Sequence, residues 1–432
     1  MGTTSEKRRR VVVTGLGLAT ALGLEVSTNW QKALKGITGI RTLVYPGAES
    51  SPVQATGSIS DEQWRQIAAA FPMEAQQQGE KRTLFALWAA QRAMSDAGLD
   101  PLPATGRERY GVMVAAGAPI NRLEDIAPWT DTSGGFDLVR FGQQYQQVHP
   151  ESIMRNNSHR PATLIASKFG LGGYNGTITS ACASATQALG LALRSIQRGE
   201  SDLMLAGGAD SMINPVGLIF FVLLGAANTT RDAPEKACRP FDRRRAGLVM
   251  GEGAGLVVLE AEAHARQRGA KIYGEVVGYG SSMDAYQVTA PEPKGYGASR
   301  SMEQALMDSG LANTDIDYIN AHGTGTKLND LAETLAIKRT FGEHADRLLV
   351  NSSKPLIGHL LAASGGPEFV FTVLSLHEDR VHPTLNLTTA DPKCNLDYVV
   401  GEARQAQIRA ALSNSFGFGG QNASIVIKKY RG

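Results

Sequence analysis

The chain contains an internal repeat, and this repeat restricts the possible folds more than any other feature of the sequence. Ala93–Leu99 reads AMSDAGL and Ala305–Leu311 reads ALMDSGL. Both have the composition of the last turn of an amphipathic helix that is closed by a glycine. Each is followed by a predicted strand that ends in small residues, Tyr110–Gly117 in the first case and Tyr318–Gly325 in the second. The pattern predicts a fold made of two related halves.

A second pair of similar segments lies upstream of the first. Val11–Gly17 and Glu275–Gly280 both read as strands that end in glycines. We therefore divide the chain into an N-terminal half, residues 1–270, and a C-terminal half, residues 271–432. No low-complexity linker separates them in the sequence, so we expect the two halves to share one compact body.

Short apolar runs indicate the type of sheet. Leu203–Ala206 and Leu256–Leu259 are typical of strands that are covered on both faces, as in layered α/β folds. Residues 118–160 are the least regular part of the chain, polar and with paired glycines at Gly134 and Gly135. We interpret this segment as a long excursion over the surface or at an interface.

Composition excludes several classes of protein. The 432 residues are 42% apolar and 19% charged, enough for a large core. The formal charge of +2 and the lack of a basic stripe argue against nucleic-acid binding. The three cysteines, Cys182, Cys238 and Cys394, are widely spaced and form neither a disulfide framework nor a zinc motif. They fit a protein of the cytoplasm.

Two segments bear on a membrane or secretory role. Lys7–Arg10 followed by apolar Val11–Leu24 has some likeness to a signal peptide, but the same residues read better as a buried strand that ends in a glycine turn. Val216–Ala227, the longest apolar run, is too short to span a bilayer and is expected to be a buried or interface segment. We therefore expect no membrane partner.

Cys182 stands where a chain would place a reactive thiol. A β-branched run, Thr177–Thr179, changes at this point to a helix-like stretch of Ala, Leu and Gln. Free N–H groups and the positive end of the helix dipole would favour the thiolate there. A lone cysteine in an Ala-rich helix is often only a small buried apolar residue.

Two later segments support the reactive interpretation. Ala321–Thr326 and Ser353–His359 each place a histidine beside Gly-rich backbone, just after an apolar run. One nucleophile and two imidazoles on loops after strands indicate acyl-thioester chemistry.

With these motifs in place, the chain resembles a β-ketoacyl-acyl carrier protein synthase of the type II class, in the thiolase superfamily. The resemblance runs over nearly the whole chain and rests on the following segments: TSACASA around Cys182, Ala206–Gly208, Arg239–Asp242, Gly251–Gly255, NAHGTGT around His322, Lys354 with Gly358–His359, and Asn414–Gly420. The resemblance implies a duplicated five-layer αβαβα fold and a dimer.

The resemblance also implies a division of roles. Cys182 accepts the acyl chain as a thioester, and malonyl-acyl carrier protein then loses CO₂ to give an enolate that attacks it. Neutral His322 and His359 would each donate an Nε2–H to the enolate oxygen, and the backbone N–H groups of Cys182 and Phe418 would form an oxyanion hole. Lys354 would orient the site together with Glu368.

Further residues follow from the same resemblance. Asp330 would support the His322 loop, and Thr324 and Thr326 would bind the phosphopantetheine arm of the carrier protein. Phe418 beside Gly419 would act as a gate on a glycine hinge, while Phe221 and Ala118 would line the acyl pocket. We expect no metal and no cofactor of its own.

The sequence departs from the pattern of a housekeeping fatty-acid enzyme at several positions. Ala118 is smaller than the residue usual there, Gly225 replaces a carrier-protein-binding arginine, and Gly366-Pro367 replaces two small apolar residues. The run Gly325–Asp330 resembles ketosynthase subunits of bacterial aromatic polyketide systems. We therefore favour type II polyketide synthesis, aromatic or polyene, with fatty-acid elongation as the alternative.

The partner would be acyl carrier protein, and the dimer either a homodimer or a heterodimer with a homologue resembling a chain-length factor.

Three other functions compete with this one. A thiolase acting on coenzyme A thioesters would carry a second catalytic cysteine near the C-terminus, and Gly417–Gly420 holds none. A non-catalytic partner subunit would not need Cys182 with both histidines. A Cys–His hydrolase would need one histidine and an open path for water.

Overall fold

The computed structural model describes residues 8–45, 47–78, 80–103, 105–119, 127–148 and 157–432. One sheet runs through the molecule in the strand order β12-β10-β9-β14-β15-β8-β1-β7-β6-β4-β5. Its strands are β1 (Val11–Ala19), β4 (Tyr110–Ala116), β5 (Asn175–Ile178), β6 (Leu203–Asp210), β7 (Gly253–Ala261), β8 (Gly274–Met283), β9 (Tyr318–Asn320), β10 (Leu349–Asn351), β12 (Asp397–Tyr398), β14 (Ala410–Gly417) and β15 (Gln421–Lys428).

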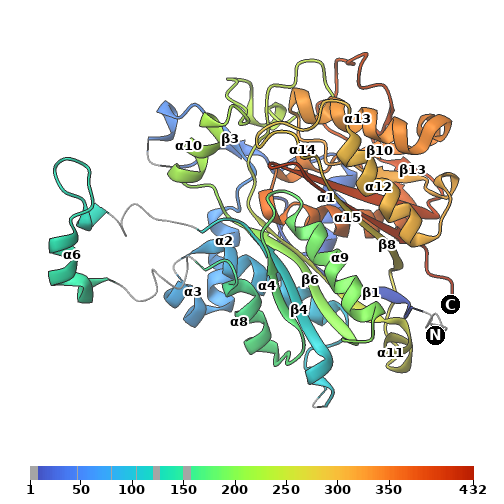
Figure 1. Cartoon of the computed structure of the whole chain (residues 1–432), viewed down its shortest axis with the longest axis horizontal. Coiled ribbons are helices and arrows are strands. Elements are labelled where there is room, and N and C mark those ends of the chain that lie inside the picture. Colours follow the sequence, from blue (N-terminus) through green and yellow to red (C-terminus); the bar gives the residue numbers. More distant parts are fainter. Residues whose placement is uncertain (1–7, 46, 79, 104, 120–126, 149–156) are drawn as a thin grey trace.

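The two halves of this sheet form two layers, and helices lie outside each of them and between them (Figure 1). On one side α4 (Lys81–Asp96) and α8 (Arg160–Phe169) pack on β1, β4, β6 and β7, and on the other α12 (Tyr296–Ser309) and α13 (Lys327–Phe341) form a pair of which α12 packs on β8 and β15. Between them, α9 (Ser184–Gln197) and α15 (Gly365–Glu378) contact strands of both halves. The predicted five-layer α/β fold is confirmed.

Smaller elements complete the chain. The remaining helices are α1 (Val26–Leu34), α2 (Asp61–Ala70), α3 (Pro72–Gln78), α6 (Leu138–Gln144), α10 (Pro215–Leu223), α11 (Glu262–Gln267) and α14 (Lys354–Ile357), and the short strands are β2 (Arg41–Thr42), β3 (Ala55–Thr56), β11 (Arg380–Val381) and β13 (Arg404–Gln405). The chain passes from one half of the sheet to the other between β7 and β8, which pair with opposite edges of β1. The boundary at residue 270 stays a prediction.

The repeat seen in the sequence has a physical cause in helix–strand packing. A Cβ on Gly15 would lie 2.1 Å from the carbonyl oxygen of Ala93, and a Cβ on Gly278 would lie 2.1 Å from that of Ala305. The glycines thus let α4 touch β1, and α12 touch β8, at backbone distance.

The same duplication extends to a hydrogen bond. Asp96 accepts the backbone N–H of Leu16 at 2.9 Å, and Asp308 accepts that of Tyr279 at 2.9 Å. Both aspartates belong to the repeated segments, and both partners stand between two strand glycines. The repeat therefore encodes one helix-on-strand contact, used once in each half.

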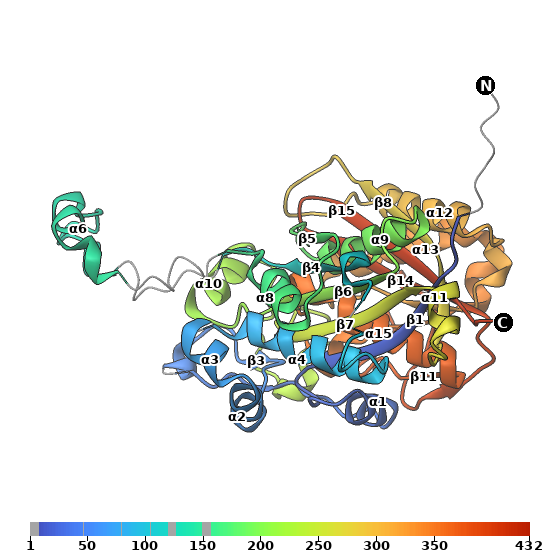
Figure 2. The same cartoon turned by 90° about the horizontal axis from the view of Figure 1, so that it is seen from below.

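Two sequence interpretations concern surface segments. The run at Val216–Ala227 forms α10, whose Leu218 and Phe221 are buried, while Ile219, Phe220 and Leu223 are 59%, 54% and 81% exposed. In the excursion, residues 127–148 with α6 stand clear of the rest of the molecule (Figures 1 and 2). No helix among the described residues is long and apolar enough to cross a membrane.

The close helix–strand contact gives a test of the fold. A Cβ on Gly17 would lie 1.9 Å from the carbonyl oxygen of Ala89, so we expect Gly17→Ala to lower the free energy of unfolding by about 1–3 kcal/mol or more. Thermal and denaturant unfolding measure the change. Gly142→Ala is the matched control, because its Cβ meets nothing within 4 Å. Equal stability of the two variants would contradict the packing described.

Candidate active site

The nucleophile sits on a sharp turn between β5 and α9. The strand ends at Ile178 and the helix begins at Ser184. Ala181 has φ of 48°, a left-handed conformation that is costly for a residue with a Cβ. The Ser184 hydroxyl accepts the N–H of Ser180 at 2.7 Å and donates to the carbonyl of Ala181 at 2.6 Å, which holds the turn. Cys182 is thereby presented at the site, 3% exposed.

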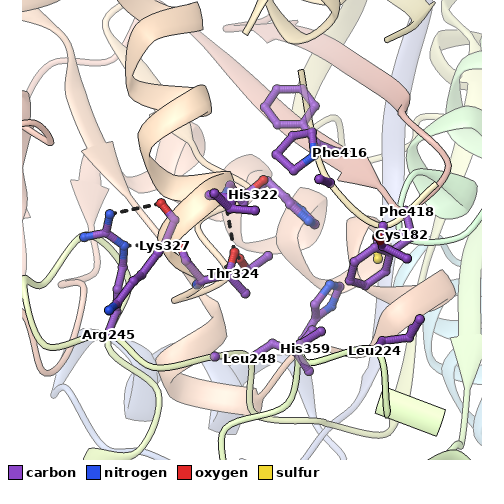
Figure 3. A pocket seen from close by; sticks show the side chains of 18 of the residues that line it. Cys182, Leu224, Arg245, Leu248, His322, Thr324, Lys327, His359, Phe416 and Phe418 are labelled. Carbon is purple, nitrogen blue, oxygen red and sulfur yellow. Dashed lines mark hydrogen bonds between the residues drawn. The ribbon is translucent and has the colours of Figure 1, made fainter. Parts of the chain in front are cut away.

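The glycine loop after β14 lies against this turn. A Cβ on Gly417 would lie 3.0 Å from the Cys182 nitrogen, so the close approach favours glycine. The backbone N–H of Phe418 donates a hydrogen bond to the Cys182 sulfur. Figure 3 shows Phe418 next to Cys182 at the edge of the pocket. An N–H group is therefore in place beside the atom that would carry an acyl group.

The protonation state of Cys182 differs from the sequence prediction. Burial raises the pKa of the thiol to about 11, and the Lys354 charge and the Phe418 N–H offset this only in part. The helix begins two residues after the cysteine, and the sulfur is shielded from water. The prediction of a thiolate in the resting protein is therefore wrong; at neutral pH Cys182 is a thiol.

Two imidazoles face the sulfur from separate loops. His322 follows β9 and His359 follows α14, and both are 1% exposed. The Cys182 sulfur and one nitrogen of each ring all lie within 4.8 Å of one another. The two rings meet edge to face, with centroids 5.2 Å apart. The structure thus brings together the three residues that the sequence singled out from distant segments.

The hydrogen bonds of His359 define its tautomer. Its Nδ1 accepts the backbone N–H of Leu361 at 3.1 Å and lies 2.7 Å from the Ser364 hydroxyl. Because a backbone N–H can only donate, Nδ1 is unprotonated and the ring proton is on Nε2. This Nε2 is buried and has no hydrogen-bond partner among the described residues. It is a donor held ready for a ligand atom.

A lysine defines the tautomer of His322 in the same way. The Lys354 ammonium lies 3.3 Å from Nδ1 of His322 and has no lone pair, so Nδ1 accepts and Nε2 carries the proton. Lys354 also donates to the carbonyl of His322 and to Glu368, the latter at 2.5 Å. All three ammonium protons are thus used inside the protein. Burial, and then the Lys354 charge, lower the pKa of both histidines well below the usual value.

The spacing of the triad would suit a metal ion, but the protonation of its two histidines would not. Cys182, His322 and His359 offer the ligand types that zinc prefers. A metal, however, binds an imidazole through a lone pair, and here both Nε2 atoms carry hydrogens because both Nδ1 atoms accept. The arrangement is suited to donating two hydrogen bonds rather than to coordinating a cation.

Two acidic side chains hold the His322 loop. Asp330 accepts the backbone N–H groups of Phe241, Thr324 and Gly325 at 2.7, 3.1 and 3.2 Å. Glu333 accepts those of His322 and Gly323, both at 2.8 Å, and burial raises its pKa to about 7. Sequence analysis found Asp330 and missed Glu333, although the spacing of three residues on one helix was a usable signal.

A cavity of about 630 Å³ leads to the triad. Thr324 and Thr326 line it, with their hydroxyls 2.9 Å apart, and so does Phe418. Gly419, with φ of +82°, donates its N–H to the carbonyl of Val288 at 2.6 Å. Phe418 is therefore flanked by glycines, of which Gly419 has a backbone conformation that side chains rarely adopt.

The two residues expected at the acyl pocket lie outside the lining of this cavity. Phe221 lies behind Phe418, which lines the cavity; the centroids of the two rings are 6.3 Å apart. Ala118 is exposed beyond the end of β4, where its carbonyl accepts a hydrogen bond from Arg82 at 3.1 Å. A role for Ala118 in an acyl pocket stays a prediction.

The raised pKa of Cys182 can be tested by alkylation. We expect reaction with iodoacetamide to be slow at pH 7 and to accelerate through pH 9, because only the thiolate reacts and the pKa lies at about 11. Intact mass and peptide mapping follow the reaction at Cys182. Cys182→Ala corrects for Cys238 and Cys394, both buried. A plateau of the rate between pH 6 and 8 would contradict the buried thiol.

Comparison with known proteins agrees with this geometry. Residues 8–265 match the family described as "Beta-ketoacyl synthase, N-terminal domain" and residues 273–388 match its C-terminal domain. The chain is 39% identical over 424 residues to 3-oxoacyl-[acyl-carrier-protein] synthase 2 of Staphylococcus aureus, covering 98% of this chain and 99% of that protein. It is 38% identical over 424 residues to the corresponding synthase of Coxiella burnetii, with the same coverage.

Solved structures give the same result. One is a type II polyketide-synthase acyl-carrier protein in complex with its ketosynthase bound to the hexaketide, with TM-score 0.88, 33% identity and coverage of 98% of this chain and 100% of that one. Another is the ishigamide ketosynthase/chain length factor, with TM-score 0.85, 32% identity and the same coverage. With the triad, the glycine loop and the duplicated fold, these matches show that the chain belongs to the β-ketoacyl synthase family.

Proposed function

We propose that the protein is a ketosynthase that joins an acyl group to a malonyl unit by decarboxylative Claisen condensation. The observation that carries the proposal is the triad: the sulfur of Cys182 and one nitrogen of each of His322 and His359 lie within 4.8 Å of one another. A nucleophile supported by two neutral donors fits acyl transfer followed by formation of an enolate.

In the first half-reaction the acyl group moves to the cysteine. The Cys182 sulfur attacks the carbonyl carbon of an acyl thioester, and the bond to the carrier's sulfur breaks. The thiol proton of Cys182 leaves with the carrier's thiol. Negative charge on the carbonyl oxygen would be stabilised by the N–H groups of Cys182 and Phe418, the latter already directed at the sulfur.

In the second half-reaction a malonyl thioester loses CO₂. The electron pair of the broken C–C bond moves into an enolate, whose oxygen accepts the Nε2–H of His322 and of His359. Its carbon then attacks the acyl thioester, and the Cys182 sulfur leaves as a thiolate that takes up a proton from solvent to restore the thiol. Two neutral donors suit this step, because an imidazolium would also stabilise the carboxylate of the ground state.

The entrance of the cavity indicates how the substrate is carried. Arg243 and Lys327 line the cavity and are exposed, and neither side chain has a partner among the described residues. Such cations fit the phosphate of a phosphopantetheine arm, with Thr324 and Thr326 further in. We infer that acyl carrier protein docks at this entrance, and that the protein needs no cofactor of its own.

We infer a second subunit from two unpartnered apolar surfaces. Ile219, Phe220 and Leu223 form an exposed stripe on α10, and Phe136, Leu138 and Val139 are exposed on the segment that stands apart from the body. Contiguous apolar surface of this kind is typical of interfaces. The second subunit is either another copy or a homologue resembling a chain-length factor. We place the protein in the cytoplasm, consistent with its three free cysteines.

Two pathways fit the same chemistry. We favour type II polyketide synthesis, because the run Gly325–Asp330 resembles ketosynthases of that class; fatty-acid elongation is the alternative, supported by the synthase 2 relatives. A thiolase is disfavoured because Phe418 and its neighbouring glycines stand where a second cysteine would be needed.

Replacing the nucleophile tests the division of roles. We expect Cys182→Ala to abolish acyl loading and condensation but to keep some decarboxylation of malonyl-carrier protein, because both Nε2–H donors remain. Intact mass reports loading and release of CO₂ reports decarboxylation. Cys394→Ala is the control and should retain both activities. Release of CO₂ no faster than in buffer would refute the assignment.

Each histidine can be removed separately. We expect His322→Ala and His359→Ala to raise the barrier to condensation by about 2.7–4 kcal/mol each, as for other oxyanion donors. Acyl loading of Cys182 should survive in both variants, since loading uses backbone donors. The exposed His159 provides a control, His159→Ala, with unchanged rates. A variant of His322 or His359 that condenses at the wild-type rate would show that this histidine is misassigned.

A further inference from the structure

The first turn of α15 lies behind both imidazoles. Ser364 immediately precedes the helix and Glu368 follows one turn later, so the two side chains share one face. The Ser364 hydroxyl contacts Nδ1 of His359 directly, while Glu368 binds Lys354, whose ammonium reaches Nδ1 of His322. One helical turn thus reaches Nδ1 of His359 directly and Nδ1 of His322 through Lys354.

Ser364 uses its hydroxyl in an unusual way for its position. A serine that precedes a helix usually accepts an N–H of the first turn, and Ser364 makes no such bond. Its oxygen lies 2.7 Å from Nδ1 of His359 instead, and the residue is 1% exposed. Because the N–H of Leu361 shows Nδ1 to be an acceptor, the hydroxyl also donates to it.

Packing fixes the position of this serine. A Cβ on Gly365 would lie 2.3 Å from Oγ1 of Thr186, and one on Gly366 would lie 2.3 Å from the carbonyl oxygen of Gly255. Pro367 packs on Gly255 in turn, its nitrogen lying 2.3 Å from where a Cβ of Gly255 would be. The turn therefore has no room to shift, and Ser364 is a rigid support for the ring it touches.

We propose that Ser364 is a positioning residue, which holds His359 as the neutral Nε2–H tautomer and prevents a second proton from binding at Nδ1. The inference rests on the proposed function. Two donors at Nδ1 stabilise its lone pair, and a proton there would displace the Leu361 N–H and force the Ser364 hydroxyl to turn from donor to acceptor. Donation to Nδ1 also polarises the ring and strengthens the Nε2–H as a donor.

The surroundings of His359 determine the direction in which its pKa is shifted. Cys182 and His322 face it across the site, Lys354 and Glu368 lie behind it, and Asp210 accepts the N–H of Ala362 at 3.1 Å on the following turn. Burial and the Lys354 charge lower the pKa of His359. The Ser364 hydroxyl adds to this effect, because it binds the unprotonated form. Its removal raises the pKa.

The test is the pH profile of malonyl-carrier protein decarboxylation by Ser364→Ala. We expect kcat to fall about three- to tenfold, the range of one hydrogen bond. The acid limb of kcat should move to higher pH by about half a unit to one unit. KM and the rate of acyl loading on Cys182 should not change, because the variant leaves the cavity and the backbone donors intact.

Two variants separate positioning from packing. Ser364→Thr keeps the hydroxyl and should keep the wild-type acid limb, whatever its added methyl group does to kcat. Ser413→Ala removes a buried hydroxyl that has no partner among the described residues, and should leave the profile unchanged.

The outcomes distinguish this inference from the proposed function. A wild-type protein that neither loads acyl groups nor releases CO₂ would overturn the function. An active wild type with an unchanged kcat and acid limb in Ser364→Ala would overturn the role of Ser364 alone. A loss of kcat with no shift of the acid limb, equal in Ser364→Thr, would also overturn it, because only packing would then have been disturbed.

Discussion

The buried ammonium of Lys354 is the interaction on which the site depends. The side chain is fully buried and donates to Nδ1 and the carbonyl of His322 and to Glu368. A charge in such a place is costly unless every donor is satisfied, and here all three are. Its position requires α14, the loop after β9 and the first turn of α15 to meet at one point. The histidine side of the site therefore depends on three separate segments of the C-terminal half.

The duplicated contact between helix and strand provides the frame for that meeting. Gly17 lies against the carbonyl of Ala89 in one half, and Gly280 against that of Ser301 in the other, at 1.9 and 2.0 Å from where a Cβ would be. The outer helices α4 and α12 pack against the sheet at backbone distance. The sheet in turn holds the ends of β5 and β9 in place. Cys182 and His322 emerge from these ends, so a duplication that serves packing also sets the distance between nucleophile and donor.

Much of this was predictable from the sequence, and the remainder has physical reasons. The repeat predicted two related halves, and the strand-to-helix junction at Cys182 with the Gly-rich segments of His322 and His359 predicted the triad, because such local signals survive in the chain. Glu333 was missed although it lies three residues from Asp330 on the same helix, because its role of accepting the N–H groups of His322 and Gly323 depends on how the loop folds back onto α13. The thiolate was wrongly predicted because burial, a property of the whole fold, outweighs the helix terminus.

Burial and the lysine act on the three reactive groups with different results. Burial disfavours charge on each of them, so it raises the pKa of Cys182 and lowers that of both histidines. The Lys354 charge favours loss of a proton from all three, and therefore assists the thiol while keeping the imidazoles neutral. A site built this way holds no net charge on its reactive atoms at rest. In the proposed reaction, negative charge develops on the sulfur and the acyl carbonyl oxygen during transfer, and then on the enolate oxygen, which would accept both Nε2–H groups.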